Sequence, residues 1–80
     1  MNTKDLDSEE IKKLFGNTAR KLRTKKGFSQ EVLAEKTGLH RTYISDVEQG
    51  VRNLSLINII KFCNALEISP ANFFKLMEEE

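Results

Sequence analysis

The chain has 80 residues, of which 31% are charged and 39% hydrophobic, and its formal net charge is +1. This length allows one small domain, and the near-neutral charge excludes a strongly basic tail protein. No apolar run approaches the roughly 20 residues that span a bilayer, and the amino terminus lacks the apolar segment of a signal peptide. The single cysteine, Cys63, cannot form an internal disulfide. These features predict a soluble cytoplasmic protein.

The sequence predicts an all-α domain of five helices with no strand. Residues 1–7 are polar and are expected to be flexible, and residues 8–80 then form the single domain. Ser8 is expected to cap the first helix, whose apolar residues recur every three or four positions. Gly27 can adopt the left-handed conformation that ends many helices, so this helix should end near Lys26.

Three later helices are preceded by an apolar residue followed by serine, a pattern typical of a capped helix start. The caps are Ser29, Ser55 and Ser69, and Pro70 stands at the first helical position, where its missing N–H costs nothing. Gly50 is expected to end the third helix. Helices two to five are therefore expected at residues 29–37, 40–49, 55–65 and 69–78.

The second and third helices are joined by the tight turn Thr37-Gly38-Leu39, which indicates a helix-turn-helix. The third helix combines an apolar back with a polar front that has no obvious use in a core. Arginine can donate two hydrogen bonds to guanine, and threonine can offer a methyl group to thymine. The residues predicted to read DNA bases are Arg41, Thr42, Tyr43 and Ser45; packing of Tyr43 against the domain is the alternative for that residue.

Phosphate contacts are expected beside the third helix, because the free backbone N–H groups at helix starts bind anions. Residues 20–52 carry eight basic and four acidic groups, whereas the segments before and after are net negative. This distribution predicts a basic face around the helix-turn-helix. The predicted phosphate-binding residues are Ser29, Gln30, His40, Arg52, Asn53 and Ser55, with a solvent-extended Arg52 as the alternative.

The carboxy-terminal part of the chain holds more apolar side chains than a core of this size needs. The excess, within residues 56–77, predicts a homodimer interface on the last helix and its approach. Such a dimer would place two recognition helices one DNA turn apart, ~34 Å, on a pseudo-palindrome. The predicted interface residues are Phe73, Phe74 and Met77.

The chain resembles the phage-repressor type of helix-turn-helix domain, the lambda repressor and Cro group. The resemblance rests on Ser29-Gln30, Leu33-Ala34, Gly38-Leu39, Ile44-Ser45 and Glu48-Gln49-Gly50. A narrower similarity to the controller proteins of restriction-modification systems rests on Leu39, Arg41-Thr42-Tyr43-Ile44-Ser45, Glu48, Gly50 and Arg52-Asn53. Those proteins are small dimeric regulators that control their own promoter and the endonuclease gene.

The resemblance implies roles for further residues. The DNA-contacting positions of the controller family fall on Arg41, Thr42, Tyr43, Ser45, Arg52 and Asn53. His40 departs from the family, in which a short acceptor such as aspartate is commoner at the cap. The resemblance also implies a structural ion pair between Arg23 and Glu48. It further implies an activation patch at Glu31 and Glu35 that contacts the sigma subunit of RNA polymerase, with an ordinary solvated helix face as the alternative.

The sequence thus predicts a regulator that binds double-stranded DNA, most closely a restriction-modification controller. A phage-type repressor or the antitoxin of a toxin–antitoxin pair is the alternative within the same class, although the chain has little length for a toxin-binding extension. A protein-interaction module without DNA binding is the alternative from another class. One histidine and no glycine-rich phosphate loop argue against an enzyme, and no cofactor, metal or small-molecule substrate is expected.

Overall fold

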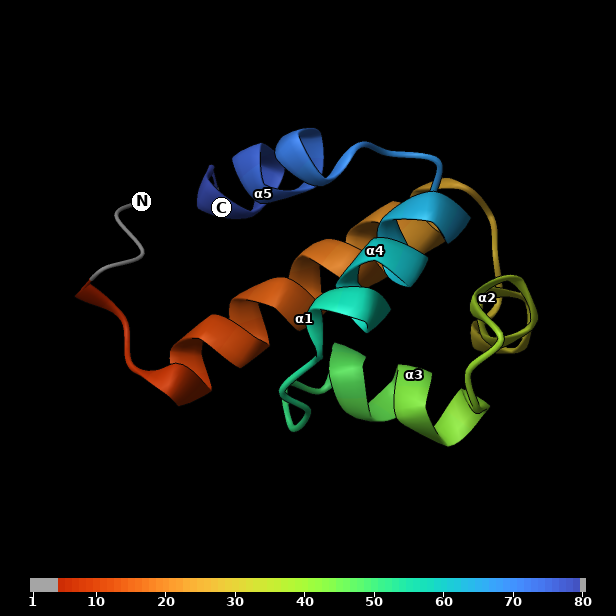
Figure 1. Ribbon diagram of the computed structural model, residues 1–80, viewed down its shortest axis with the longest axis horizontal. Coiled ribbons are helices and arrows are strands. Elements are labelled where there is room, and N and C mark those ends of the chain that lie inside the picture. The colour runs from red at the N-terminus through yellow and green to blue at the C-terminus, as the bar shows by residue number, and fades with distance from the viewer. Residues whose placement is uncertain (1–4, 80) are drawn as a thin grey trace.

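The computed structural model describes residues 5–79, and within this range it contains five helices and no strand. The helices are α1 (Ser8–Lys25), α2 (Gln30–Thr37), α3 (Arg41–Glu48), α4 (Leu56–Ala65) and α5 (Pro70–Glu78). The long helix α1 contacts α3 on one side and α5 on another, and α2 packs against both α3 and α4 (Figure 1). The prediction of an all-α fold with five helices is confirmed.

The start of α1 corrects one prediction. Asp7, and not Ser8, is the cap: its Oδ1 accepts a hydrogen bond from the backbone N–H of Glu10 at 2.8 Å. The Glu10 carboxylate accepts the N–H of Asp7 in return, at 3.4 Å, which completes a capping box. Ser8 is therefore the first helical residue. Residues 1–4 of the predicted flexible segment, and Glu80, lie outside the described residues.

The other helix starts follow the sequence more closely. The side chains of Ser29, Ser55 and Ser69 each accept the backbone N–H of the residue three positions later, so all three are caps as predicted. His40 makes no side-chain cap hydrogen bond at the start of α3. A missing cap leaves backbone N–H groups at this helix start without an internal partner. These groups therefore remain available to an external acceptor.

The core lies where the five helices meet. Phe15 of α1 packs edge-on against Phe62 of α4, with 6.1 Å between ring centroids. Its ring is tilted against that of Phe73 of α5, with 4.7 Å between centroids. Cys63 is fully buried beside them, and burial raises the pKa of its thiol. Largely apolar side chains from every helix thus fix the position of α3 relative to the rest of the domain.

Gly16 sets how closely α1 approaches α3. A Cβ atom at this position would collide with the carbonyl oxygens of Val47 and Glu48, which belong to the last turn of α3. The absence of a side chain therefore lets the end of α3 lie directly against α1. Since the first turn of α3 lies at the opposite end, this contact anchors the helix while leaving its start free.

Two of the three residues predicted for the dimer interface are in the core of the subunit. Phe73 is fully buried and Met77 is 5% exposed, so that prediction is wrong for both. The face of α5 that carries them packs onto the core, because burying a large apolar side chain stabilises the fold by roughly 1.5–3 kcal/mol. Phe74 borders the same face of α5, with its ring centroid 5.6 Å from that of Phe73 and 6.4 Å from that of Phe15, and remains 36% exposed.

Candidate nucleic-acid interface

The turn between α2 and α3 fixes the angle between the two helices. Gly38 adopts the left-handed conformation at φ +72°, which a residue with a side chain rarely does. Thr37 is buried, and its hydroxyl donates to the carbonyl oxygen of Leu33 at 2.8 Å. The same hydroxyl oxygen accepts the backbone N–H of Leu39 at 3.3 Å. These contacts hold the beginning of α3 in one orientation.

Helix α3 has one buried and one open face. Ile44 and Val47 are buried in the core, whereas Arg41 and Thr42 are exposed in the first turn. Ser45 follows one turn later on the same side as Arg41 and is partly exposed. The structure therefore places three of the four residues predicted to read bases on one accessible strip of α3.

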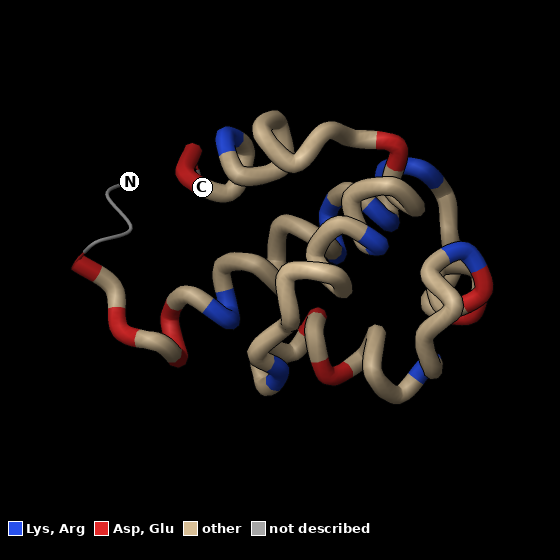
Figure 2. The backbone as a smooth tube through the Cα atoms, viewed as in Figure 1, with Lys and Arg blue, Asp and Glu red and all other residues tan. Residues whose placement is uncertain are grey.

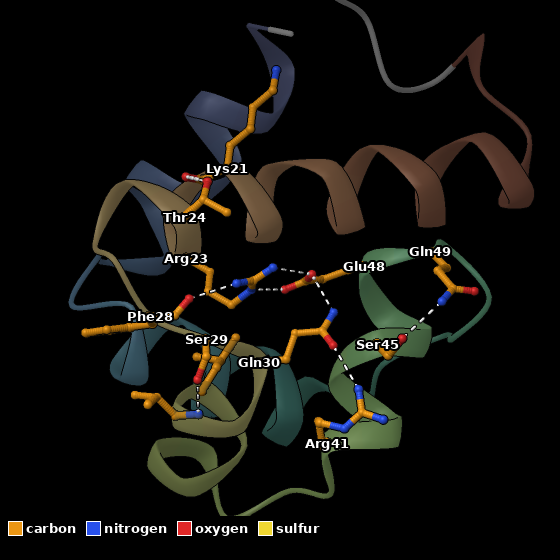
Figure 3. Close-up of polar contacts among 12 residues, drawn as sticks. Lys21, Arg23, Thr24, Phe28, Ser29, Gln30, Arg41, Ser45, Glu48 and Gln49 are labelled. Atoms are coloured by element: carbon orange, nitrogen blue, oxygen red, sulfur yellow. Dashed lines mark hydrogen bonds and ion pairs between the residues drawn. The ribbon is translucent and has the colours of Figure 1, made fainter.

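The predicted ion pair between Arg23 and Glu48 is present and nearly buried (Figure 3). Their side chains are 12% and 3% exposed. The Nε and Nη2 atoms of Arg23 donate to the two carboxylate oxygens of Glu48 at 2.6 and 2.9 Å, and Nη1 donates to the carbonyl oxygen of Phe28 at 2.8 Å. The pair of parallel hydrogen bonds has the strong geometry that arginine forms with carboxylates. Hydrogen bonding to Glu48 raises the pKa of Arg23.

The same carboxylate extends this network to the first turn of α3 (Figure 3). Oε1 of Glu48 also accepts a hydrogen bond from Nε2 of Gln30 at 3.0 Å. An ionised carboxylate can only accept, so it fixes the orientation of the Gln30 amide. The amide oxygen of Gln30 then faces outward and accepts from Nη1 of Arg41 at 3.2 Å. A buried ion pair thereby holds an exposed arginine in the first turn of α3.

Tyr43 lies on the flank of α3, facing the loop that leads to α4. Its hydroxyl oxygen accepts a hydrogen bond from Nδ2 of Asn58 at 3.0 Å, and the guanidinium of Arg52 lies 4.8 Å from the ring centroid. Arg52 also donates to Asp46 through Nε at 3.4 Å. Tyr43 is only partly exposed, so it both packs against the domain and borders the open face.

The remaining predicted phosphate-binding residues lie around α3. Ser29 and Ser55 cap α2 and α4, and their hydroxyl oxygens already accept backbone N–H groups at 3.1 Å. His40 is exposed at the start of α3, and Asn53 is exposed in the loop between α3 and α4. The open strip of α3 is thus bordered by two helix starts, whose backbone N–H groups favour anions.

The charge distribution differs in part from the prediction (Figure 2). Lys21 points away from α3 in the close-up of Figure 3. Lys26 forms an ion pair with Glu67 at 2.9 Å, which joins the turn after α1 to the turn after α4. Part of the basic excess of residues 20–52 therefore lies away from the recognition helix, because Lys21 and Lys25 lie one turn apart on the side of α1 near Leu76 of α5. Arg41 and Arg52 do lie beside the open strip.

The sequence predicted no functional role for three residues of this region: Asp46, Gln49 and Asn58. Nε2 of Gln49 donates to the Ser45 hydroxyl oxygen at 3.0 Å, one turn along α3. The spacing of these two residues could have suggested that contact. Asn58 and Asp46 contact partners brought close by the loop between α3 and α4, for which the sequence offers no local signal.

Residues 5–79 contain no group of three or more histidine, cysteine or acidic side chains placed to hold a metal ion. No helix in the described part of the chain is both long and apolar enough to cross a bilayer.

An arrangement of this kind, with a short helix presented across a glycine turn, defines the helix-turn-helix class. The helix-turn-helix family matches residues 20–73, and the chain belongs to it. Within that class the chain belongs to the restriction-modification controller proteins. The control protein C.BamHI of Bacillus amyloliquefaciens is 50% identical over 64 residues, which cover 79% of each chain. The control protein C.MunI of Mycoplasma sp is 43% identical over 72 residues, covering 89% of this chain and 97% of the relative.

Solved structures agree with this assignment. The controller protein C.AhdI from Aeromonas hydrophila has a TM-score of 0.76 and 51% identity over 79% of this chain and 96% of its own. The controller protein C.Esp1396I, solved as a tetramer in complex with its natural 35 base-pair operator, has a TM-score of 0.82 and 35% identity. That match covers 86% of this chain and 91% of the C.Esp1396I chain.

Proposed function

We propose that this protein is a sequence-specific transcriptional regulator that binds a pseudo-palindromic operator and controls its own gene and that of the associated endonuclease. The observation that carries the proposal is the exposed first turn of α3, where Arg41 is held outward by Gln30 and Thr42 stands beside it. Its relatives are named as control proteins, and one was solved on its operator. The role is regulatory rather than catalytic, and its place is the bacterial cytoplasm, where the DNA lies.

In this proposal the side chains divide into two groups. Arg41, Thr42 and Ser45 read base edges in the major groove, and Tyr43 contacts the groove from the flank. A second group fixes the domain on the sugar-phosphate chains. This group comprises Ser29, Gln30, His40, Arg52, Asn53 and Ser55.

Fluorescence anisotropy with a duplex from upstream of the protein's own gene tests this proposal. We expect the affinity to fall linearly with salt concentration on logarithmic axes, because phosphate contacts release counterions. An unrelated duplex of equal length serves as the control and should bind far more weakly at every salt concentration. Equal affinity for the two duplexes would contradict the proposal and favour the protein-interaction alternative.

We also propose that the regulator is a homodimer, with an interface that differs from the sequence prediction. Leu56 and Ile57, in the first turn of α4, are 73% and 64% exposed, and Ile60 lies on the same helix face at 37%. Apolar residues this exposed and this close together favour burial against a second subunit.

Sedimentation equilibrium separates α4 from α5 as the centre of this interface. Ile57→Lys should give a monomer, because a charged side chain would be buried in the contact. Phe74→Lys, the matched change on α5, should weaken the dimer less. If the dimer remains with Ile57→Lys and dissociates with Phe74→Lys, the interface is centred on α5 instead.

The sigma-subunit contact is a separate proposal. Glu31 and Glu35 are exposed one turn apart on α2, and α2 lies beside the recognition helix. Their carboxylates could therefore reach a polymerase subunit bound to neighbouring DNA. In transcription assays with purified polymerase, Glu31→Ala/Glu35→Ala should bind the operator normally and fail to activate. Normal activation by this variant would leave the two residues as an ordinary solvated face.

A further inference from the structure

Asn58 occupies an unusual place for a residue in the first turn of a helix. Its backbone N–H donates to the cap residue Ser55 at 3.1 Å, which is the ordinary contact at this helix position. Its side chain turns back along the chain, and Nδ2 donates to the hydroxyl oxygen of Tyr43 at 3.0 Å. The asparagine thus links α4 to the flank of the recognition helix, across 15 residues of sequence.

This hydrogen bond belongs to a continuous set of contacts. The Tyr43 ring lies under the guanidinium of Arg52, with 4.8 Å between the guanidinium carbon and the ring centroid. Arg52 in turn contacts Asp46 on α3 at 3.4 Å. Arg52 is 47% exposed at its side chain and stands on a loop, so the ring and Asp46 are what hold it. If the tyrosine ring turned, Arg52 would keep only its contact with Asp46.

The direction of the hydrogen bond between Asn58 and Tyr43 determines what the tyrosine hydroxyl can still donate. Because the Tyr43 oxygen accepts the N–H of Asn58, the hydroxyl hydrogen remains free to be donated to another acceptor. Tyr43 is partly exposed beside the open strip of α3, where a duplex would present phosphate oxygens and base acceptors. Asn58 thereby fixes both the ring position and the direction in which the hydroxyl can donate.

We propose that Asn58 is a positioning residue for DNA recognition: without touching the duplex, it sets the Tyr43 ring and, through it, Arg52. The inference rests on the proposed function. It predicts that Asn58 contributes to affinity and to the choice of bases next to Tyr43 and Arg52, and that it does so only through the tyrosine hydroxyl.

A double-mutant cycle between Asn58→Leu and Tyr43→Phe tests this dependence. The probe is a duplex selected by the wild-type protein from a random-sequence pool, together with its single-base variants. Asn58→Leu, which keeps the side-chain size, should weaken binding about tenfold and flatten the preference among the single-base variants. Adding Asn58→Leu to Tyr43→Phe should change the dissociation constant little, since the hydroxyl on which Asn58 acts is already absent.

Asn72 provides a matched control. It occupies the same position in α5, three residues after the cap Ser69, whose hydroxyl oxygen accepts its backbone N–H at 3.1 Å. The Asn72 side chain is exposed, and α5 lies away from α3 (Figure 1). Asn72→Leu should therefore leave both affinity and base preference unchanged. If Asn58→Leu fails to fold, Asn58→Ala takes its place, and Asn58→Gln should restore part of the affinity by restoring the amide donor.

Several outcomes would overturn the inference. It fails if Asn58→Leu binds the selected duplex and its variants as the wild type does. It also fails if the loss is as large in the Tyr43→Phe background, because Asn58 would then act directly or through the fold alone. A wild-type protein that enriches no duplex overturns the proposed function itself, which separates that failure from the first two.

Discussion

Two ion pairs that begin three residues apart in the sequence behave differently in the folded chain. Arg23 and Glu48 have side chains 12% and 3% exposed, and Arg23 uses three nitrogen atoms to contact its partners. Lys26 and Glu67 are 32% and 66% exposed and share one contact of 2.9 Å. Burial, and not charge, decides what an ion pair does: the first supports the recognition helix, and the second joins two surface turns.

The largest effect is expected at the buried pair. Glu48→Ala should lower the free energy of unfolding by about 3–5 kcal/mol, because it leaves the Arg23 guanidinium buried without its partner. Chemical denaturation measures this change. The apolar double variant Arg23→Met/Glu48→Leu should recover most of the stability and still bind DNA weakly, since nothing then orients Gln30. Full DNA affinity in a stable double variant would show that the network has no part in recognition.

Arg41 should show the opposite behaviour, because its replacement should lower DNA affinity and leave stability unchanged. Arg41→Ala should weaken the binding free energy for the operator by about 1–3 kcal/mol, with loss of preference at one base pair. Its melting temperature should stay at the wild-type value, because the side chain is exposed. Anisotropy and thermal melting of the same preparation give both numbers. A large loss of stability would instead assign Arg41 to the fold.

Gln30 lies between Glu48 and Arg41 in the hydrogen-bond network, and its replacement should have an intermediate effect on DNA affinity. Gln30→Met removes the acceptor of Arg41 and should weaken operator binding by about 0.5–1.5 kcal/mol, the net value of one hydrogen bond. The same change in the Arg41→Ala background should cause a smaller loss, which measures the phosphate contact proposed for Gln30. No loss in that background would mean that Gln30 acts only by orienting Arg41.

The smallest effect on stability is expected at the exposed ion pair of Lys26 and Glu67. Lys26→Met is expected to leave the melting temperature at neutral pH close to that of the wild type, because solvent screens the pair. Hydrogen bonding to Lys26 lowers the pKa of Glu67 below its ordinary value of 4.5. The small stabilisation is therefore present above that value and is lost as the pH falls through the lowered pKa. Melting curves of the wild type and Lys26→Met should converge in acid; a gap that widened there would contradict this sign.

Local sequence patterns specify the five helices and most of their bounds. Serine caps, the Gly38 turn and the period of apolar residues act over three or four positions, so they can be identified without the fold. The same local pattern identified Arg41 and Thr42 as the exposed start of α3. The one wrong cap, Ser8 for Asp7, is an error of one residue between two good capping types.

The packing of the helices sets which side chains meet. Phe73 and Met77 became core residues because α5 packs that face inward, which helical spacing alone cannot specify. Asn58 reaches Tyr43, and Gln30 bridges Glu48 to Arg41, because a glycine turn and a loop return distant segments to the same place. Helices form from contacts between near neighbours in the chain, whereas the recognition surface is assembled from residues far apart in it, and only packing brings those together.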